Sequence, residues 1–181
     1  EPIDRTTLVA MIDLCIDADQ PILIYGTPGI AKSETAREIT ERKGYALLDV
    51  RAGNIPPEDF AGIAWPDQQT KRVERLMPDV VSAAWALHEK AGKPVVIFLD
   101  EINHCAHAAQ GPLYSIVLER QAAGYPLPPG TRIIAAGNPE GSGSISEEMS
   151  RALLDRFLVV EYAGPTPSEF SNYADSVSLN P

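Results

Sequence analysis

The chain has 181 residues, of which 44% are hydrophobic and 22% are charged, and its formal net charge at pH 7 is −10. This length and composition predict one globular domain, and the acidic balance argues against a dedicated nucleic-acid-binding protein, since phosphate contacts need clustered Lys and Arg. Because the longest apolar runs are too short to cross a bilayer, no basic and apolar leader opens the chain and only two cysteines are present, we expect a cytoplasmic protein without a membrane segment.

The first half of the chain alternates helix and strand signals. Apolar residues at helical spacing predict a helix over residues 5–17, and the continuous apolar run of residues 21–25 predicts a buried strand that enters a Gly-Thr-Pro-Gly loop. Residues 32–42 favour a helix, and residues 45–50 a second strand. Several Pro and Gly turn signals over residues 53–77 predict a partly helical insertion that carries a small hairpin.

The second half continues this alternation. We expect, in order, a helix over 78–89, a strand over 95–99, a helix over about 104–122, a strand over 132–136, a helix over 147–154 and a strand over 157–162. Strands that alternate with helices predict an α/β fold, in which right-handed crossovers place helices on both faces of a parallel sheet. Ligands of such sheets bind beyond the carboxyl ends of the strands.

A glycine-rich loop follows the first predicted strand. Its sequence, Gly-Thr-Pro-Gly-Ile-Ala-Lys-Ser, matches the phosphate-binding pattern G-x-x-x-x-G-K-[ST] except that Ala31 replaces a glycine. Lys32 would supply charge to the outer phosphates and Ser33 a hydroxyl to Mg²⁺. We expect Ala31 to lie in the first helical turn, where a Cβ is tolerated, rather than at a position that needs positive φ. The residues expected to bind the nucleotide are Gly26, Thr27, Pro28, Gly29, Ile30, Ala31, Lys32, Ser33 and Glu34.

The alternative for this loop is a plain Gly/Pro turn with an incidental Lys-Ser pair. The strand before it, the helix after it and an acidic motif downstream favour the phosphate loop. That acidic motif, Asp100-Glu101 after the apolar run 95–99, resembles a Walker B motif. We expect Asp100 to orient Mg²⁺ together with Ser33, and Glu101 to act as the general base. Two acids that simply favour a helix N-terminus are the alternative.

Further candidate residues lie after the fourth predicted strand and just before the fifth. Asn138 ends the strand predicted over 132–136 and would hold the attacking water or the γ-phosphate with a neutral amide. Arg156, or else Arg151, would reach a neighbouring subunit's γ-phosphate as an arginine finger. The alternative for both arginines is a helix C-terminus that favours cations.

With these motifs in order, the chain resembles the AAA+ ATPases of the MoxR-like and dynein-related group. The resemblance rests on G-T-P-G-I-A-K-S at 26–33, F-L-D-E-I-N at 98–103, A-G-N-P at 136–139 and A-L-L-D-R-F at 152–157. It covers roughly residues 5–162, and the joint occurrence of the motifs is specific.

The resemblance implies a three-layer αβα P-loop NTPase core that binds ATP and Mg²⁺, with a five-stranded parallel sheet of order 5-1-4-3-2. It also implies an insert hairpin at 63–77 that faces a pore or partner, a homo-oligomer in the form of a hexameric ring, and remodelling of a protein client. Many members of this group work beside a protein with a von Willebrand A domain. We expect residues 1–164 to form the core and residues 165–181 to be a linker or the start of a truncated helical lid, which is otherwise absent.

Three functions fit these observations. An ATP-driven remodelling ATPase accounts for all four motifs. A nucleic-acid-directed motor with the same fold is disfavoured by the acidic charge. A non-catalytic module, in which ATP only holds an assembly together, is disfavoured by the presence of both Glu101 and Asn138.

Overall fold

A five-stranded parallel sheet forms the centre of the protein, whose computed structural model describes residues 1–138 and 149–166. When these five strands alone are numbered along the chain, the order is 5-1-4-3-2, so the predicted topology is confirmed. In spatial order the strands are β2 (Ala46–Arg51), β5 (Val95–Asp100), β8 (Arg132–Gly137), β1 (Ile22–Tyr25) and β9 (Leu158–Glu161).

The central strands are buried on both faces, which explains their continuous apolar runs. Successive side chains of a strand point to opposite faces. In β5, Ile97 and Leu99 therefore belong to one core cluster, and Val96 and Phe98 belong to the other. All four are fully buried.

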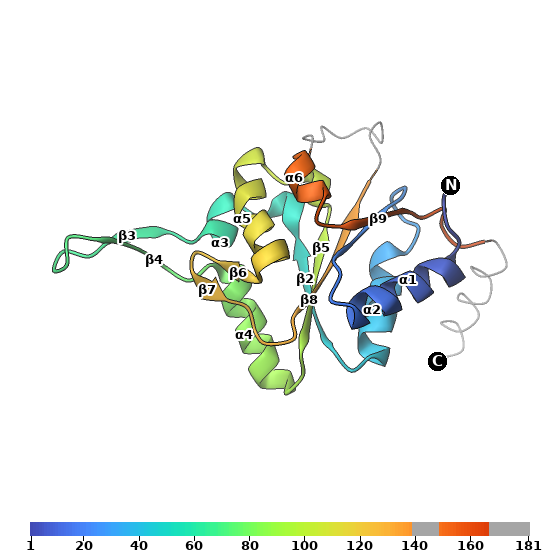
Figure 1. Ribbon diagram of the computed structural model, residues 1–181, viewed down its shortest axis with the longest axis horizontal. Coiled ribbons are helices and arrows are strands. Elements are labelled where there is room, and N and C mark those ends of the chain that lie inside the picture. The colour runs from blue at the N-terminus through green and yellow to red at the C-terminus, as the bar shows by residue number, and fades with distance from the viewer. Residues whose placement is uncertain (139–148, 167–181) are drawn as a thin grey trace, which may run out of the picture.

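Helices cover both faces of the sheet, as expected (Figure 1). The cluster on one face takes its helical residues from α1 and α2, and the cluster on the other face takes them from α3, α4, α5 and α6. The bounds are α1 (Arg5–Asp17), α2 (Lys32–Arg42), α3 (Pro57–Ala61), α4 (Asp79–Ala91), α5 (His107–Glu119) and α6 (Arg151–Leu154). Within the described ranges, no helix is long and apolar enough to span a membrane.

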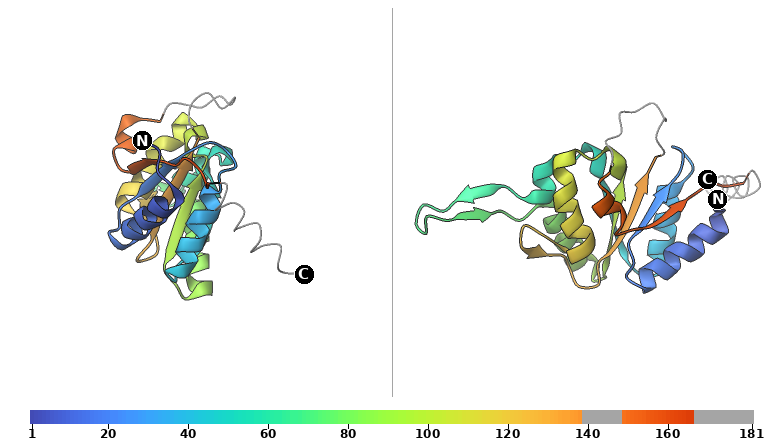
Figure 2. Two further views of the ribbon diagram at one scale, coloured as in Figure 1. Left: turned by 90° about the vertical axis from the view of Figure 1, so that its right-hand side faces the viewer. Right: turned by 45° about the horizontal axis from the view of Figure 1, so that its top comes forward.

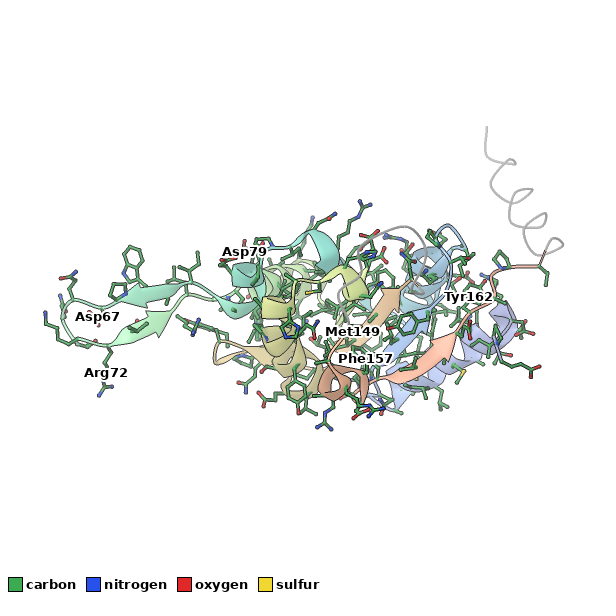
Figure 3. The ribbon with its side chains drawn as sticks, turned by 90° about the horizontal axis from the view of Figure 1, so that it is seen from above. Asp67, Arg72, Asp79, Met149, Phe157 and Tyr162 are labelled. Carbon is green, nitrogen blue, oxygen red and sulfur yellow. The ribbon has the colours of Figure 1, made fainter. Side chains whose placement is uncertain are left out.

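The predicted insertion is present between β2 and α4. A short 3₁₀ turn, η1 (Ala52–Asn54), leads to α3, and then β3 (Ala64–Pro66) and β4 (Val73–Arg75) pair as an antiparallel hairpin. The hairpin projects from the rest of the protein (Figure 2), and Asp67 and Arg72 lie at its outer end (Figure 3). Trp65 is 61% exposed and Val73 is 70% exposed, so both apolar side chains lie largely at the surface.

The helix expected over about 104–122 is shorter at both ends than predicted. A 3₁₀ turn, η2 (Ile102–His104), precedes α5, and a short hairpin of β6 (Gln121–Ala122) and β7 (Tyr125–Pro126) follows it. The helix ends because Arg120 adopts the left-handed conformation, with φ 54°. Sequence periodicity gives no signal for a single left-handed residue of this type.

The last predicted helix is shorter than expected. It begins at Arg151, because Ser150 is its N-cap and accepts a hydrogen bond from Leu153 N at 3.4 Å. The expectation of a helix over 149–150 is therefore wrong, and residues 147 and 148 lie outside the described residues.

Candidate functional site

Three of the predicted motifs meet at the carboxyl ends of β1, β5 and β8, which are neighbours in the sheet. The glycine-rich loop follows β1, Asp100 ends β5 with Glu101 directly after it, and Asn138 follows β8. A hydrogen bond of 2.8 Å from Lys32 Nζ to Asn138 Oδ1 joins the first motif to the third. The structure thus brings together residues that are more than 100 positions apart in sequence.

Lys32 is the centre of this site. Its Nζ donates to Gly26 O at 2.6 Å and to Thr27 O at 3.2 Å, in addition to Asn138. The side chain is only 8% exposed, and burial lowers its pKa, while the charges of Asp100 and Glu101 act in the opposite direction. None of the ion pairs among the described residues includes Lys32. A buried ammonium that is held only by neutral oxygens is suited to bind an anion.

Ala31 does not lie in the first helical turn, so that prediction is wrong. It is the N-cap of α2 in the left-handed conformation, with φ 62° and ψ 32°. Its carbonyl already accepts the first helical hydrogen bond, from Thr35 N at 3.0 Å. The chain must turn sharply between loop and helix, and Ala31 adopts the conformation that a glycine would favour at this position.

The N-terminus of α2 has no side-chain cap. The first N–H groups of a helix have no acceptor within the helix, and the helix dipole makes this end positive. Ser33 is half-buried here and Glu34 is exposed. With the ammonium of Lys32 nearby, this helix end is suited to a phosphate chain.

Two glycines shape the loop for different reasons. A Cβ at Gly26 would overlap Ile30 Cδ1 and would lie 2.9 Å from Tyr162 O, so no larger residue fits there. Gly29 has open space on its side-chain side but a φ of 81°, which favours glycine. Thr27 and Pro28, between them, are exposed, so the tip of the loop is accessible to a ligand.

The acidic pair lies at a sharp turn. Asp100 is half-buried, and its Oδ1 accepts a hydrogen bond from Glu101 N at 2.9 Å. Glu101 has φ 54° and ψ 37°, a left-handed conformation that costs a residue with a Cβ on the order of 1–3 kcal/mol. This turn takes Glu101 out of the strand direction and lets the chain enter η2.

The oxygen donors of the site fit Mg²⁺ bound together with a nucleotide. Ser33 offers a hydroxyl and Asp100 a carboxylate, both hard ligands. In the part of the chain that the structure describes, no group of three or more His, Cys, Asp or Glu residues could hold a metal ion. Mg²⁺ is usually held by one or two carboxylates and by substrate phosphates, so this sparse donor set is sufficient only when phosphates complete it.

Sequence reasoning missed one residue of this site, Asn103. Its side-chain Nδ2 donates to Asn138 O at 3.1 Å, and its Oδ1 accepts from Asn138 N at 3.1 Å. Asn103 is 6% exposed. The available signal was an amide residue two positions after Glu101, directly after the apolar Ile102.

Neither candidate arginine contacts Lys32 or Asn138 through a hydrogen bond in the described part of the chain. Arg156 is exposed, donates from Nη2 to the hydroxyl of Tyr114 at 3.0 Å and stacks over that ring, with Cζ 5.4 Å from the ring centroid. Arg151 is exposed on α6. Beside Tyr114 lies a pocket of about 340 Å³, lined by His107, Gln110, Gly111, Tyr114, Ser150 and Ala152.

Comparison with known proteins gives likenesses of sequence and of fold. The family described as AAA domain (dynein-related subfamily) matches residues 21–157. Midasin of Giardia intestinalis is 28% identical over 148 residues, which are 78% of this chain and 3% of midasin. Cell division protein C of Sulfolobus acidocaldarius is 30% identical over 82 residues, 45% of this chain and 19% of that protein. This chain therefore spans only a small part of the curated relatives that it matches.

A solved structure has the same fold. It is that of a candidate ATPase from Cytophaga hutchinsonii, with a TM-score of 0.66 and 20% sequence identity. The match covers 97% of this chain and 51% of that chain.

Proposed function

The chain belongs to the dynein-related subfamily of AAA domains, and from this membership and the geometry around Lys32 we propose that it binds MgATP and hydrolyses it. The observation that carries the proposal is the buried Lys32 ammonium beside an uncapped helix N-terminus. Both features favour an anion, and a triphosphate supplies one that can reach both.

Binding would replace hydrogen bonds that Lys32 now makes. Lys32 Nζ would turn from the carbonyls of Gly26 and Thr27 to the outer phosphates, and the N–H groups at the start of α2 would face the phosphate chain. Ser33 and Asp100 would hold Mg²⁺, which supplies charge neutralisation to the phosphates. Lys32 would keep its bond to Asn138, so the lysine would link phosphate and amide.

Hydrolysis would need a base and a group that orients water. Glu101 would accept the proton of the attacking water. It directly follows Asp100, the proposed Mg²⁺ ligand at the end of β5, so its carboxylate would lie close to the phosphates. Asn138 would orient that water with its neutral amide. The electrostatic effect of both acids on Lys32 supports their placement near the phosphates.

We propose further that hydrolysis occurs between subunits of a homo-oligomeric ring, a hexamer in this family's usual form, within the cytoplasm. Arg156 would serve the neighbouring site as the arginine finger, with Arg151 as the second choice; the exposure of both supports this. Arg156 would then have to leave Tyr114. The exposed hairpin of β3 and β4 would contact a protein client or a von Willebrand A-domain partner, and a MoxR-like remodelling role follows from these assignments. The boundary proposed after residue 164 stays a prediction, since residues 167–181 lie outside the described residues.

The substitution Glu101→Gln tests the assignment of base and reaction together. It should leave MgATP binding in place and lower the hydrolysis rate about 10²–10⁴-fold, because an amide cannot accept the proton. Glu89→Gln, on the exposed side of α4, is the matched control and should keep full activity.

Phosphate release and nucleotide binding should be measured on the same samples. Unchanged turnover in Glu101→Gln would remove Glu101 as the base. A wild-type protein that binds ATP but never cleaves it would instead indicate the non-catalytic assembly module. Stimulation of hydrolysis by DNA would indicate the nucleic-acid-directed motor.

A further inference from the structure

The side chain of Asn103 pairs with both main-chain groups of one residue, Asn138. Its Nδ2 donates to Asn138 O and its Oδ1 accepts from Asn138 N, each at 3.1 Å. A side-chain amide with this pairing presents the same donor and acceptor as a peptide group in a neighbouring strand. Asn103 therefore acts as a substitute for one more residue of β5.

The sheet needs such a substitute at this point. β5 and β8 pair in register up to Leu99 and Ala135, and after Asp100 the left-handed Glu101 turns the chain away from β8. The main chain of Asn138, one residue beyond β8, would then lose its strand partner on that side. Asn103 returns from η2 and supplies that partner.

The contact is close as well as buried. A Cβ at Gly137 would lie 3.1 Å from Asn103 Oδ1 and 3.0 Å from Tyr25 Cε1, so the absence of a side chain there lets the amide approach β8. Asn103 and its neighbour Ile102 are 6% and 1% exposed. The amide consequently has little freedom to adopt another orientation.

We propose that Asn103 is a positioning residue for hydrolysis, an inference that rests on the function proposed above. It fixes the main chain of Asn138, and so the direction in which Asn138 Oδ1 meets Lys32 Nζ at 2.8 Å. Because Asn103 lies two residues after Glu101, the same pair of bonds also fixes the turn that carries the base. The proposed base, Glu101, and the water-orienting amide of Asn138 are thereby held in one geometry, and Asn103 acts through them.

The substitution Asn103→Leu removes both hydrogen bonds at similar volume. We expect kcat to fall about tenfold to a hundredfold, because catalytic groups that shift by about 1 Å lose this much. KM for MgATP should change far less, since the loop and the N-terminus of α2 are untouched. Asn103→Asp is a second variant that keeps the shape and the acceptor but loses the donor, and it should lower kcat in the same way.

The matched control is Thr131→Val, at the other end of β8. Thr131 is 3% exposed, and its hydroxyl donates to Pro128 O at 2.6 Å, so this variant also removes a buried side-chain-to-backbone hydrogen bond. It should lower the melting temperature as Asn103→Leu does and leave kcat unchanged. An equal fall of kcat in Thr131→Val would mean that Asn103 affects hydrolysis only through the stability of the fold. This result would overturn the proposal.

A double-mutant cycle separates positioning from other roles. If Asn103 acts through Asn138, then Asn103→Leu should lower kcat much less in an Asn138→Ala background than in the wild type. Equal losses in the two backgrounds would contradict the inference, as would wild-type kcat in both Asn103 variants.

Nuclear magnetic resonance gives a readout that does not depend on hydrolysis. The side-chain amide signals of Asn138, in ¹⁵N–¹H spectra of the full chain without nucleotide, should shift in Asn103→Leu and stay in place in Thr131→Val. If the wild type binds no nucleotide, the proposed function is refuted. The Asn138 signals should still shift in Asn103→Leu in that case, because the contact between the two residues does not require nucleotide. If the wild type hydrolyses ATP and the Asn138 signals do not move, only the role of Asn103 is refuted.

Discussion

The left-handed conformation of Ala31 makes a sharp prediction about stability. Ala31 is exposed and has φ 62°, so Ala31→Gly removes an unfavourable Cβ without opening a cavity. An L-residue with a Cβ in this conformation costs roughly 1–2 kcal/mol relative to the right-handed one. Glycine gives back about 0.4–1 kcal/mol through the greater freedom of the unfolded chain. We therefore expect a net stabilisation of about 0.5–1 kcal/mol.

Two other alanines provide matched controls. Ala123 has φ 53° in the turn between β6 and β7, so Ala123→Gly should stabilise by a similar amount. Ala86 is exposed in the middle of α4, and Ala86→Gly should destabilise by about 1 kcal/mol.

Chemical denaturation of the four proteins measures these differences directly, and the melting temperature of Ala31→Gly should rise by about 1–4 °C. The sign of the change in the free energy of unfolding distinguishes the two conformations of Ala31. If Ala31 lay in the first turn of the helix, its replacement by glycine would destabilise the protein. If Ala31→Gly destabilises as much as Ala86→Gly, the left-handed N-cap is wrong.

Further substitutions test η2, the two candidate arginines and the exposed hairpin. A Cβ at Gly53 would lie 2.8 Å from His104 Cβ and would press on η2, so Gly53→Ala should lower kcat with little change in MgATP affinity, measured by steady-state kinetics. Arg156→Ala should abolish hydrolysis in the assembled protein and preserve nucleotide binding. If Arg151→Ala abolishes hydrolysis and Arg156→Ala does not, then Arg151 is the arginine finger. Trp65→Ser should leave the melting temperature within about 2 °C of the wild type, because the indole is 61% exposed; a larger fall would mean that the hairpin packs on the body.

The sequence was sufficient for the sheet and for the placement of its motifs. Runs such as Val95–Leu99 are apolar on both faces, which is typical of a parallel strand that is covered on both sides, and the alternation with helices supports that reading. The sequence was insufficient where a single residue adopts an unusual backbone conformation. Arg120 ends α5 with φ 54°, and the identity of this residue does not predict that turn.

At the candidate site, the positions of the motifs in the fold were easier to predict than the local geometry. The placement of Lys32, Asp100 and Asn138 near neighbouring strand ends follows from the motifs, because each motif comes directly after a predicted strand. Asn103 was missed, since its partner is the main chain of a residue 35 positions away, and main-chain partners leave no mark in a sequence pattern. The contact between Arg156 and Tyr114 was missed for a related reason, as it joins α5 to the segment after α6 only in the folded chain.

Calorimetric titration of MgATP into the full chain tests the central claim most directly. The account predicts binding by the wild type and by Lys90→Ala, an exposed lysine of α4, and loss of binding in Lys32→Ala with its fold retained. Absence of heat from a folded wild type, or equal affinity in Lys32→Ala, would contradict it.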